Sequence, residues 1–137
     1  MPRDISEMEV RPTRRYVKIW ELEGFTDDDG RLLKVVLSPK TQGTGRFSLS
    51  VVVAPPGTRG PVHVHEESDE FWYILDGRGE IIIGDERVPV EPDMLIHGPA
   101  NIPHQLINSS KDPLRAIFIF SPAGPEEKFV HEMASVR

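Results

Sequence analysis

Short apolar, β-branched runs separated by turn-forming residues limit the possible folds of this chain more than any other feature. Runs of this kind cover residues 32–37, 47–53, 71–75, 80–83, 87–90, 94–96, 104–107 and 115–120. Asp76-Gly77 and Pro92-Asp93 are typical of the turns between them. Many short strands with frequent turns predict an all-β sandwich or barrel. The long helical patterns that would connect parallel strands are missing between the runs, so we do not expect a βαβ sheet.

The two ends of the chain differ from this central part. Residues 1–15 are polar, charged and interrupted by proline, which predicts an N-terminal arm, and residues 16–137 have a length typical of one domain. The weak alternation of residues 16–20 favours one more strand. From Pro125 to about Ser135, apolar residues recur at helical spacing after a proline that suits a first helical turn. We therefore expect a short C-terminal helix.

Charge and composition narrow the possible partners. The net charge is −6 and no basic stripe offsets the acids, which argues against a nucleic-acid partner. There is no cysteine, so neither disulfides nor thiolate metal ligands are possible. Since no secretion signal and no long apolar stretch are visible, we expect a soluble cytoplasmic protein without a membrane partner.

Three histidines and one glutamate form the pattern that most directly indicates chemistry. His63 and His65 are two residues apart, so on an extended strand their side chains leave from the same face. Glu70 starts the run at 71–75, and His104 starts the run at 104–107. If the four side chains converge inside a β-barrel, they form a divalent-metal site with room for water or a substrate.

The spacing of these residues resembles a known sequence motif. Five residues separate Gly57 from His63, and one separates His63 from His65. Four residues then separate His65 from Glu70, and six separate Glu70 from Gly77. This stretch resembles the complete first motif of the cupin superfamily. The resemblance extends over about residues 45–120, which is most of the chain.

A second stretch resembles the second cupin motif less completely. It contains Pro99, Asn101, His104 and Asn108. Where the family usually has glycine this chain has Asp93 and Asn101, and where the family has an acid it has Met94. Asp and Asn tolerate a left-handed backbone better than most residues, so we expect the two turns to survive these replacements.

The resemblance implies a fold and a metal site. The implied fold is a small single-domain cupin spanning 16–137, a double-stranded β-helix or jelly-roll barrel. The implied metal ligands are His63, His65, Glu70 and His104. The implied ion is one divalent metal, with Mn²⁺ or Fe²⁺ favoured and Zn²⁺, Ni²⁺, Co²⁺ or Cu²⁺ as alternatives.

Strand parity indicates which other side chains surround the metal. Trp72 and Ile74 share the face of Glu70, and Leu106 shares the face of His104. The candidates that could bind the carboxylate of a substrate are Arg46, Arg59 and Arg115. His97, just before a Gly-Pro turn, is a candidate acid or base at the mouth of the cavity. The alternating residues of the run at 71–75 point outward and need a cover, which sheet-on-sheet packing or a second subunit would supply, and a homodimer is the default expectation.

Two classes of small-molecule function fit these features, and a third possibility is a stand-alone barrel that assists a larger complex. The first is a metal-dependent enzyme that acts on a small, oxygen-rich organic molecule by dioxygenase, isomerase, decarboxylase or lyase chemistry. The second is a cupin module that binds a small molecule or a sugar without turnover. The cupin scaffold carries many chemistries, so the sequence leaves the choice open.

Overall fold

The computed structural model describes residues 16–43 and 45–128. Within these ranges the chain forms nine strands, one short 3₁₀ helix and one short α-helix. The strands are β1 (Phe25–Thr26), β2 (Leu32–Leu37), β3 (Ser48–Ala54), β4 (Asp69–Asp76), β5 (Gly79–Ile83), β6 (Glu86–Val90), β7 (Leu95–Gly98), β8 (His104–Ile107) and β9 (Leu114–Ser121). The helices are η1 (Ile19–Glu21) and α2 (Pro39–Gln42).

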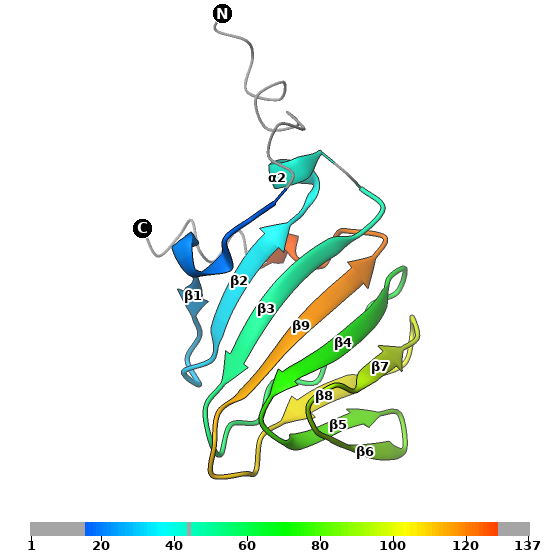
Figure 1. The fold of residues 1–137 in the computed structure, drawn as a ribbon. Coiled ribbons are helices and arrows are strands. Elements are labelled where there is room, and N and C mark those ends of the chain that lie inside the picture. The colour runs from blue at the N-terminus through cyan, green and yellow to red at the C-terminus, as the bar shows by residue number, and fades with distance from the viewer. Residues whose placement is uncertain (1–15, 44, 129–137) are drawn as a thin grey trace, which may run out of the picture.

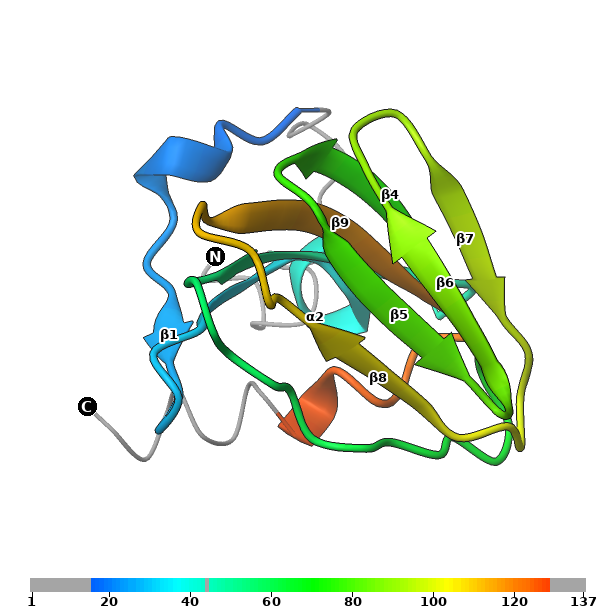
Figure 2. The ribbon, with the colours of Figure 1, turned by 90° about the horizontal axis from the view of Figure 1, so that it is seen from below.

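The strands pair into two antiparallel sheets (Figure 1). The larger sheet has the order β1-β2-β3-β9-β4-β7, and the smaller one has the order β6-β5-β8. Seen from below, the smaller sheet faces the strands of the larger one (Figure 2). The predicted all-β, jelly-roll class is confirmed, although within the described residues the two sheets do not close into one continuous barrel.

The core lies between the two sheets. Along β4 the burial alternates: Trp72 and Ile74 are buried, whereas Phe71 and Tyr73, which alternate with them, are half-buried on the other face. Strand β9 contributes inward residues such as Phe118 in the same way. Full burial of one such apolar side chain contributes about 1.5–3 kcal/mol, so this core stabilises the face that carries the site.

The segment between β3 and β4 extends the smaller sheet. Gly57 and Gly60 donate backbone hydrogen bonds to the carbonyls of Asn108 (2.7 Å) and Leu106 (2.9 Å). His63 and His104 donate to each other's carbonyl oxygens, both at 2.9 Å. The segment therefore lies antiparallel beside β8, and it carries the motif histidines to the same edge as His104.

The left-handed turns predicted from the sequence are present. Asp93 has φ 70° and Asn101 has φ 66°. Both stand where the family usually has glycine, so their short polar side chains keep turns that glycine normally provides. Gly77, in contrast, cannot be replaced easily: it has φ 85°, and an added Cβ would lie 2.2 Å from the Pro113 carbonyl oxygen.

The N-terminal end differs from the prediction. Residues 16–20 do not form a strand, because Leu22 and Glu21 donate to Ile19 and Lys18 and close the 3₁₀ turn η1. Trp20 is 77% exposed, so no sheet neighbour buries the alternating side chains. The predicted arm at 1–15 lies outside the described residues. Of the predicted helix from Pro125 to about Ser135, the structure describes only residues 125–128, where the Lys128 amide donates to the Pro125 carbonyl at 3.4 Å and residues 127–128 are helical. Within the described part, no helix combines the length and apolar character needed to span a membrane.

Candidate metal centre

One side of the candidate site comes from the smaller sheet. Because His63 and His104 exchange both backbone hydrogen bonds, they are directly opposite each other and their side chains leave on the same face. The His65 carbonyl accepts a hydrogen bond of 2.8 Å from the amide of Asn101, which fixes the next residue of the motif beside the turn before β8. Three imidazoles thus point from one sheet edge into the space between the sheets.

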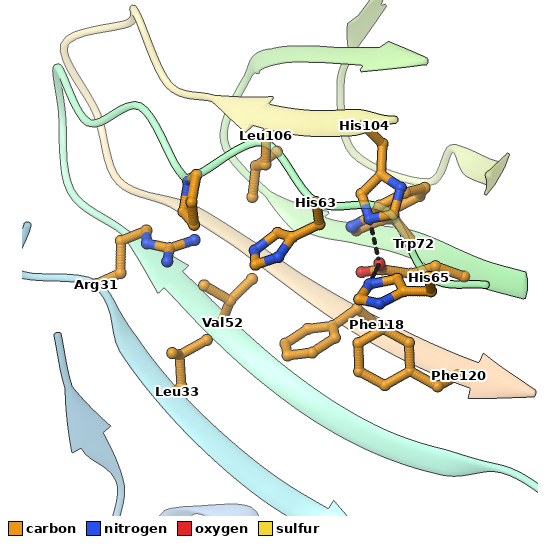
Figure 3. A pocket seen from close by; sticks show the side chains of 12 residues that line it. Arg31, Leu33, Val52, His63, His65, Trp72, His104, Leu106, Phe118 and Phe120 are labelled. Carbon is orange, nitrogen blue, oxygen red and sulfur yellow. Dashed lines mark ion pairs between the residues drawn. The ribbon is translucent and has the colours of Figure 1, made fainter. Parts of the chain in front are cut away.

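The other side of the site is Glu70 on β4 of the larger sheet. Its Oε1 lies 2.7 Å from His104 Nε2 and 3.3 Å from His65 Nε2 (Figure 3). Both nitrogens are buried and neither forms a hydrogen bond, so the short contacts lack hydrogen-bond geometry. The three ligand atoms all lie within 4.8 Å of one another. A buried carboxylate oxygen and two buried imidazole nitrogens that converge without hydrogen-bond geometry have the atom types and spacing of a divalent-cation site.

Neighbouring groups orient the two clustered histidines. His104 Nδ1 lies 3.4 Å from the Ile102 carbonyl oxygen, on the side of the ring away from the cluster, while Nε2 is turned toward Glu70. The His104 ring lies edge-on to Trp72 at 5.1 Å, and the His65 ring lies edge-on to Phe120 at 5.0 Å. Aromatic packing therefore restricts both rings before any ion binds.

The environment also determines the protonation of the site. Burial would raise the pKa of Glu70, but the contacts with His104 and His65 outweigh it and hold that pKa below its ordinary value. Burial lowers the pKa of His63 to about 4, with the nearby Glu70 opposing the shift. A carboxylate and a neutral imidazole are the forms that bind metal ions.

His63 lies beside the cluster and not within it. Its ring centroid is 5.7 Å from that of His65 and 6.0 Å from that of His104. The structure thus brings together three of the four predicted ligands and places the fourth on the same cavity wall. Metal binding by the four residues stays a prediction at this point.

A cavity of about 50 Å³ opens beside the cluster. It is lined by Arg31, Leu33, Val52, Pro61, His63, His65, Glu70, Trp72, His104, Leu106, Phe118 and Phe120. A larger outer chamber of about 270 Å³ shares Arg31, Leu33, Pro61 and His63 with it. The two spaces are therefore adjacent, with His65, Glu70 and His104 lining only the inner one.

The apolar residues predicted to surround the metal divide into two groups. Trp72 and Leu106 line the cavity, as strand parity predicted. Ile74 has the same parity as Trp72 but is fully buried in the core and does not line the cavity. Parity selects a face of a strand, whereas position along the strand decides whether a side chain reaches the cavity.

None of the three predicted arginines lines the inner cavity. Arg59 is exposed and lines the outer chamber. Arg46 and Arg115 are exposed, and Arg115 lines a separate hollow beside the β4–β5 turn. The guanidinium that reaches the cavity belongs to Arg31, which the sequence analysis missed. The sequence signal that could have indicated it is the position of Arg31 four residues after Asp27, which allows the two side chains to pair across a turn.

His97 faces away from the cavity, contrary to the prediction that placed it at the cavity mouth. On β7 the buried positions are Ile96 and Gly98, so His97 points to the outer face. There its Nε2 lies 3.1 Å from Asp69 Oδ2, and its ring stacks on Phe71 at 4.7 Å. It therefore covers part of the outward apolar surface of β4 and is not an acid or base of this cavity.

A family comparison agrees with the geometry. The profile of the cupin domain family Cupin_2 matches residues 50–120, more than half of the chain. This chain belongs to the cupin family. The matched range contains both halves of the cluster, the motif segment before β4 and the histidine of β8. Membership in the cupin family and the His-His-Glu cluster together indicate a divalent metal.

This cupin has relatives among proteins of polyketide biosynthesis. It is 27% identical over 130 residues to the "Polyketide synthase CurC" of Streptomyces cyaneus, covering 95% of this chain and 76% of the relative. It is 26% identical over 102 residues to the "Tetracenomycin polyketide synthase protein TcmJ" of Streptomyces glaucescens, covering 74% of this chain and 68% of that protein.

Solved structures confirm the cupin fold. A predicted oxalate decarboxylase from Thermotoga maritima superposes with a TM-score of 0.73 at 18% identity, covering 79% of this chain and 99% of that one. The polyketide cyclase RemF from Streptomyces resistomycificus superposes with a TM-score of 0.70 at 19% identity and covers 80% of both chains. At these identities the likeness concerns the fold alone.

Proposed function

We propose that this cupin is a divalent-metal-dependent enzyme that acts on a small, oxygen-rich organic molecule. Its metal ligands in this proposal are His63, His65, Glu70 and His104. The observation that carries the proposal is the approach of two buried imidazole nitrogens to one carboxylate oxygen without a hydrogen bond. Without a cation, such an arrangement leaves buried polar atoms unsatisfied, which costs about 1–3 kcal/mol for each group.

His63 completes the proposed ligand set from the cavity side. Its lowered pKa keeps the imidazole neutral at physiological pH, and it faces the same cavity as the cluster. A set of three imidazoles and one carboxylate leaves two positions on a six-coordinate ion for substrate oxygens. The apolar cavity walls around Trp72 and Phe118 exclude water from the reacting group.

The bound ion would supply a Lewis acid that polarises a carbonyl or carboxylate oxygen and stabilises the negative charge that develops there. Glu70 and the histidines hold the ion, so they are not free to carry protons during the reaction. The cavity walls then orient the substrate by shape, in a space whose volume of about 50 Å³ admits only a small molecule or one end of a larger one.

For the identity of the ion we retain Mn²⁺ or Fe²⁺, which the family resemblance favours. Iron would open dioxygenase chemistry, whereas manganese or zinc would suit isomerisation, decarboxylation or lyase chemistry. The names of the two sequence relatives refer to polyketide synthesis, and this supports a substrate rich in carbonyl oxygens.

A binding module without turnover is the second candidate. One observation favours it: among the described residues that line the inner cavity, the only titratable group besides the four proposed ligands is Arg31. An enzyme that moves a proton would then have to use a ligand, bound water or a group on the substrate. The same cavity would still capture a small ligand through the ion.

Elemental analysis and calorimetric metal titration test the proposal. We expect one equivalent of divalent metal in wild-type protein and less than about a tenth of that in the His63→Ala/His104→Ala double variant. His97→Ala is the matched control, because it removes a histidine that also contacts a carboxylate but lies outside the cavity. Wild-type protein that binds no divalent ion would end the proposal, as would a double variant that binds metal as tightly as wild type.

A further inference from the structure

We propose that Arg31 is the carboxylate-binding residue of the cavity and that the ligand is a small dicarboxylate or oxo-acid. One oxygen-bearing end of the ligand faces the His65–Glu70–His104 cluster, and its carboxylate faces Arg31. This inference rests on the proposed function, and it names the class of substrate for the same site.

The position of Arg31 is the first support. It lines both the inner cavity and the outer chamber, whereas the cluster lines only the inner one. Figure 3 shows the Arg31 guanidinium pointing into the cavity from one end, with His65 and His104 at the other end and His63 between them. Any ligand that enters from the outer chamber passes this guanidinium before it reaches the cluster.

Asp27 holds the guanidinium in a fixed direction. Its Oδ2 accepts hydrogen bonds from Arg31 Nε at 2.8 Å and contacts Nη2 at 2.7 Å. Its Oδ1 accepts hydrogen bonds from the backbone amides of Asp29 at 3.0 Å and Arg31 at 2.9 Å. These bonds fix the turn between β1 and β2. The Arg31 side chain is only 11% exposed, so little rotamer freedom remains to be lost when a ligand binds.

The third guanidinium nitrogen, Nη1, makes neither of these contacts with Asp27 and lies beside the segment between β3 and β4. A Cβ added to Gly60 would lie 2.8 Å from Nη1, so a side chain there would require the guanidinium to shift from its present position. Pro61 and Leu33, which are apolar, line the cavity together with Arg31. A charged donor in partly apolar surroundings binds a carboxylate more strongly than one in open solvent.

The residues of the cavity point to an acid and not to a neutral sugar. The described cavity lining holds no Ser, Thr, Asn, Gln or Tyr side chain that could bind several hydroxyl groups. Its polar groups, besides the Trp72 indole, are the guanidinium at the outer end, the His65–Glu70–His104 cluster at the inner end and the His63 imidazole between them. Polar groups at both ends, with walls that are otherwise mostly apolar, match a short molecule with an oxygen group at each end.

A purely structural role for Arg31 is the competing explanation, since the pair with Asp27 also locks the β1–β2 turn. The two roles differ in what they predict for ligand selectivity. A structural arginine would change the melting temperature and would alter the affinity for acids and amides alike. A carboxylate-binding arginine would change the preference for the acid over its neutral amide.

Calorimetry on Mn²⁺-loaded protein separates the two roles, with malonate and succinate as probes and their monoamides as matched neutral analogues. We expect wild-type protein to bind at least one diacid about tenfold or more tighter than its monoamide, because one charge-assisted pair is lost in the amide. In Arg31→Gln this ratio should fall to within about threefold, while Mn²⁺ affinity stays within about threefold of wild type. Arg59→Gln, which removes a positive charge from the outer chamber alone, should keep the ratio.

Each contrary outcome has a definite meaning. If metal-loaded wild-type protein binds neither diacid, or if Arg31→Gln keeps the preference for the acid, the inference is wrong. If Arg31→Gln loses affinity for diacid and monoamide equally, its role is structural. If wild-type protein fails to bind Mn²⁺ in a titration made before the probes are added, the proposed function fails, independently of Arg31.

Discussion

Two adjacent residues of β4 each contact a histidine, one on each face of the larger sheet. Glu70 points inward and lies 2.7 Å from His104 Nε2, with both side chains less than a tenth exposed. Asp69 points outward and lies 3.1 Å from His97 Nε2, with both side chains more than two fifths exposed. The residue types and the distances are similar, yet only the outer pair has hydrogen-bond geometry.

The difference shows which properties mark a metal centre. The polar atoms of the outer pair have hydrogen-bond partners. Asp69 accepts a hydrogen bond of 2.9 Å from the amide of Ala100 in addition to its contact with His97, and these contacts lower the pKa of Asp69. The inner pair leaves the buried Nε2 of His104 close to a carboxylate oxygen without a hydrogen bond, and His65 repeats the arrangement. Burial together with unsatisfied, converging atoms therefore distinguishes a ligand set from an ordinary surface ion pair.

The largest expected effect is a difference in Mn²⁺ affinity between variants of the two histidines, His104 of the inner pair and His97 of the outer pair. His104→Ala should weaken Mn²⁺ binding by about 100-fold or more, because losing a residue that merely orients a ligand already costs about 10–100-fold. His97→Ala should leave Mn²⁺ affinity within about threefold. Isothermal titration of both variants measures the ratio, and equal affinities would remove the distinction between the inner and the outer pair.

The next effect concerns the two carboxylates. With metal at about 100 times its Kd, wild-type protein should gain about 2.7 kcal/mol in free energy of unfolding. Glu70→Gln, which keeps the size of the side chain, should lose most of this gain. Asp69→Asn should retain it, because Asp69 faces away from the cavity. Denaturant unfolding with and without metal gives both numbers, and a retained gain in Glu70→Gln would argue against Glu70 as a ligand.

Much of this comparison could be predicted from the sequence, because strand parity and motif spacing are local properties. The run at 71–75 predicted the alternation of β4, and the motif predicted three ligands that the structure brings together. Asp93 and Asn101 were correctly expected to adopt left-handed turns. These features depend on neighbours a few residues apart, where sequence patterns are informative.

The features that the sequence did not predict depend on pairing between distant segments. Arg31 reaches the cavity because β2 lies beside β3 and because Asp27 directs its guanidinium, and no motif marks either fact. The face of His97 follows from the pairing of Glu70 with Gly98, which places His97 opposite Phe71. The register between β4 and β7 is a tertiary property, so a histidine next to a turn was assigned to the wrong face.

A smaller effect concerns His63 in metal-free protein. Its pKa is about 4 in the folded chain and near 6.5 in the unfolded chain, so the unfolded state binds more protons between these values. Stability from this group is complete above about pH 6.5 and falls as the pH approaches 4. Wild type should therefore lose on the order of 1 kcal/mol more than His63→Gln between pH 7 and 4.5, after allowance for solvent screening. Urea unfolding at both pH values measures this difference, and parallel losses would show that His63 is not kept neutral.

The smallest effect is expected at the outer pair. Replacing His97 by Ala should lower the free energy of unfolding by about 1 kcal/mol or less. An exposed ion pair contributes little to stability, and part of the decrease comes from removing the stacking on Phe71. The part that comes from the ion pair should shrink when salt is raised from about 0.01 M to 1 M. A loss of several kcal/mol that is insensitive to salt would mean that the outer pair is more than a surface contact.

Anomalous X-ray diffraction from crystals soaked with Mn²⁺ tests the central claim most directly. The account predicts a single strong anomalous peak within bonding distance of Glu70 and of the imidazoles of His63, His65 and His104, with none between Asp69 and His97. A metal-loaded crystal with no peak at the inner cluster, or with its peak at the outer pair, would contradict it.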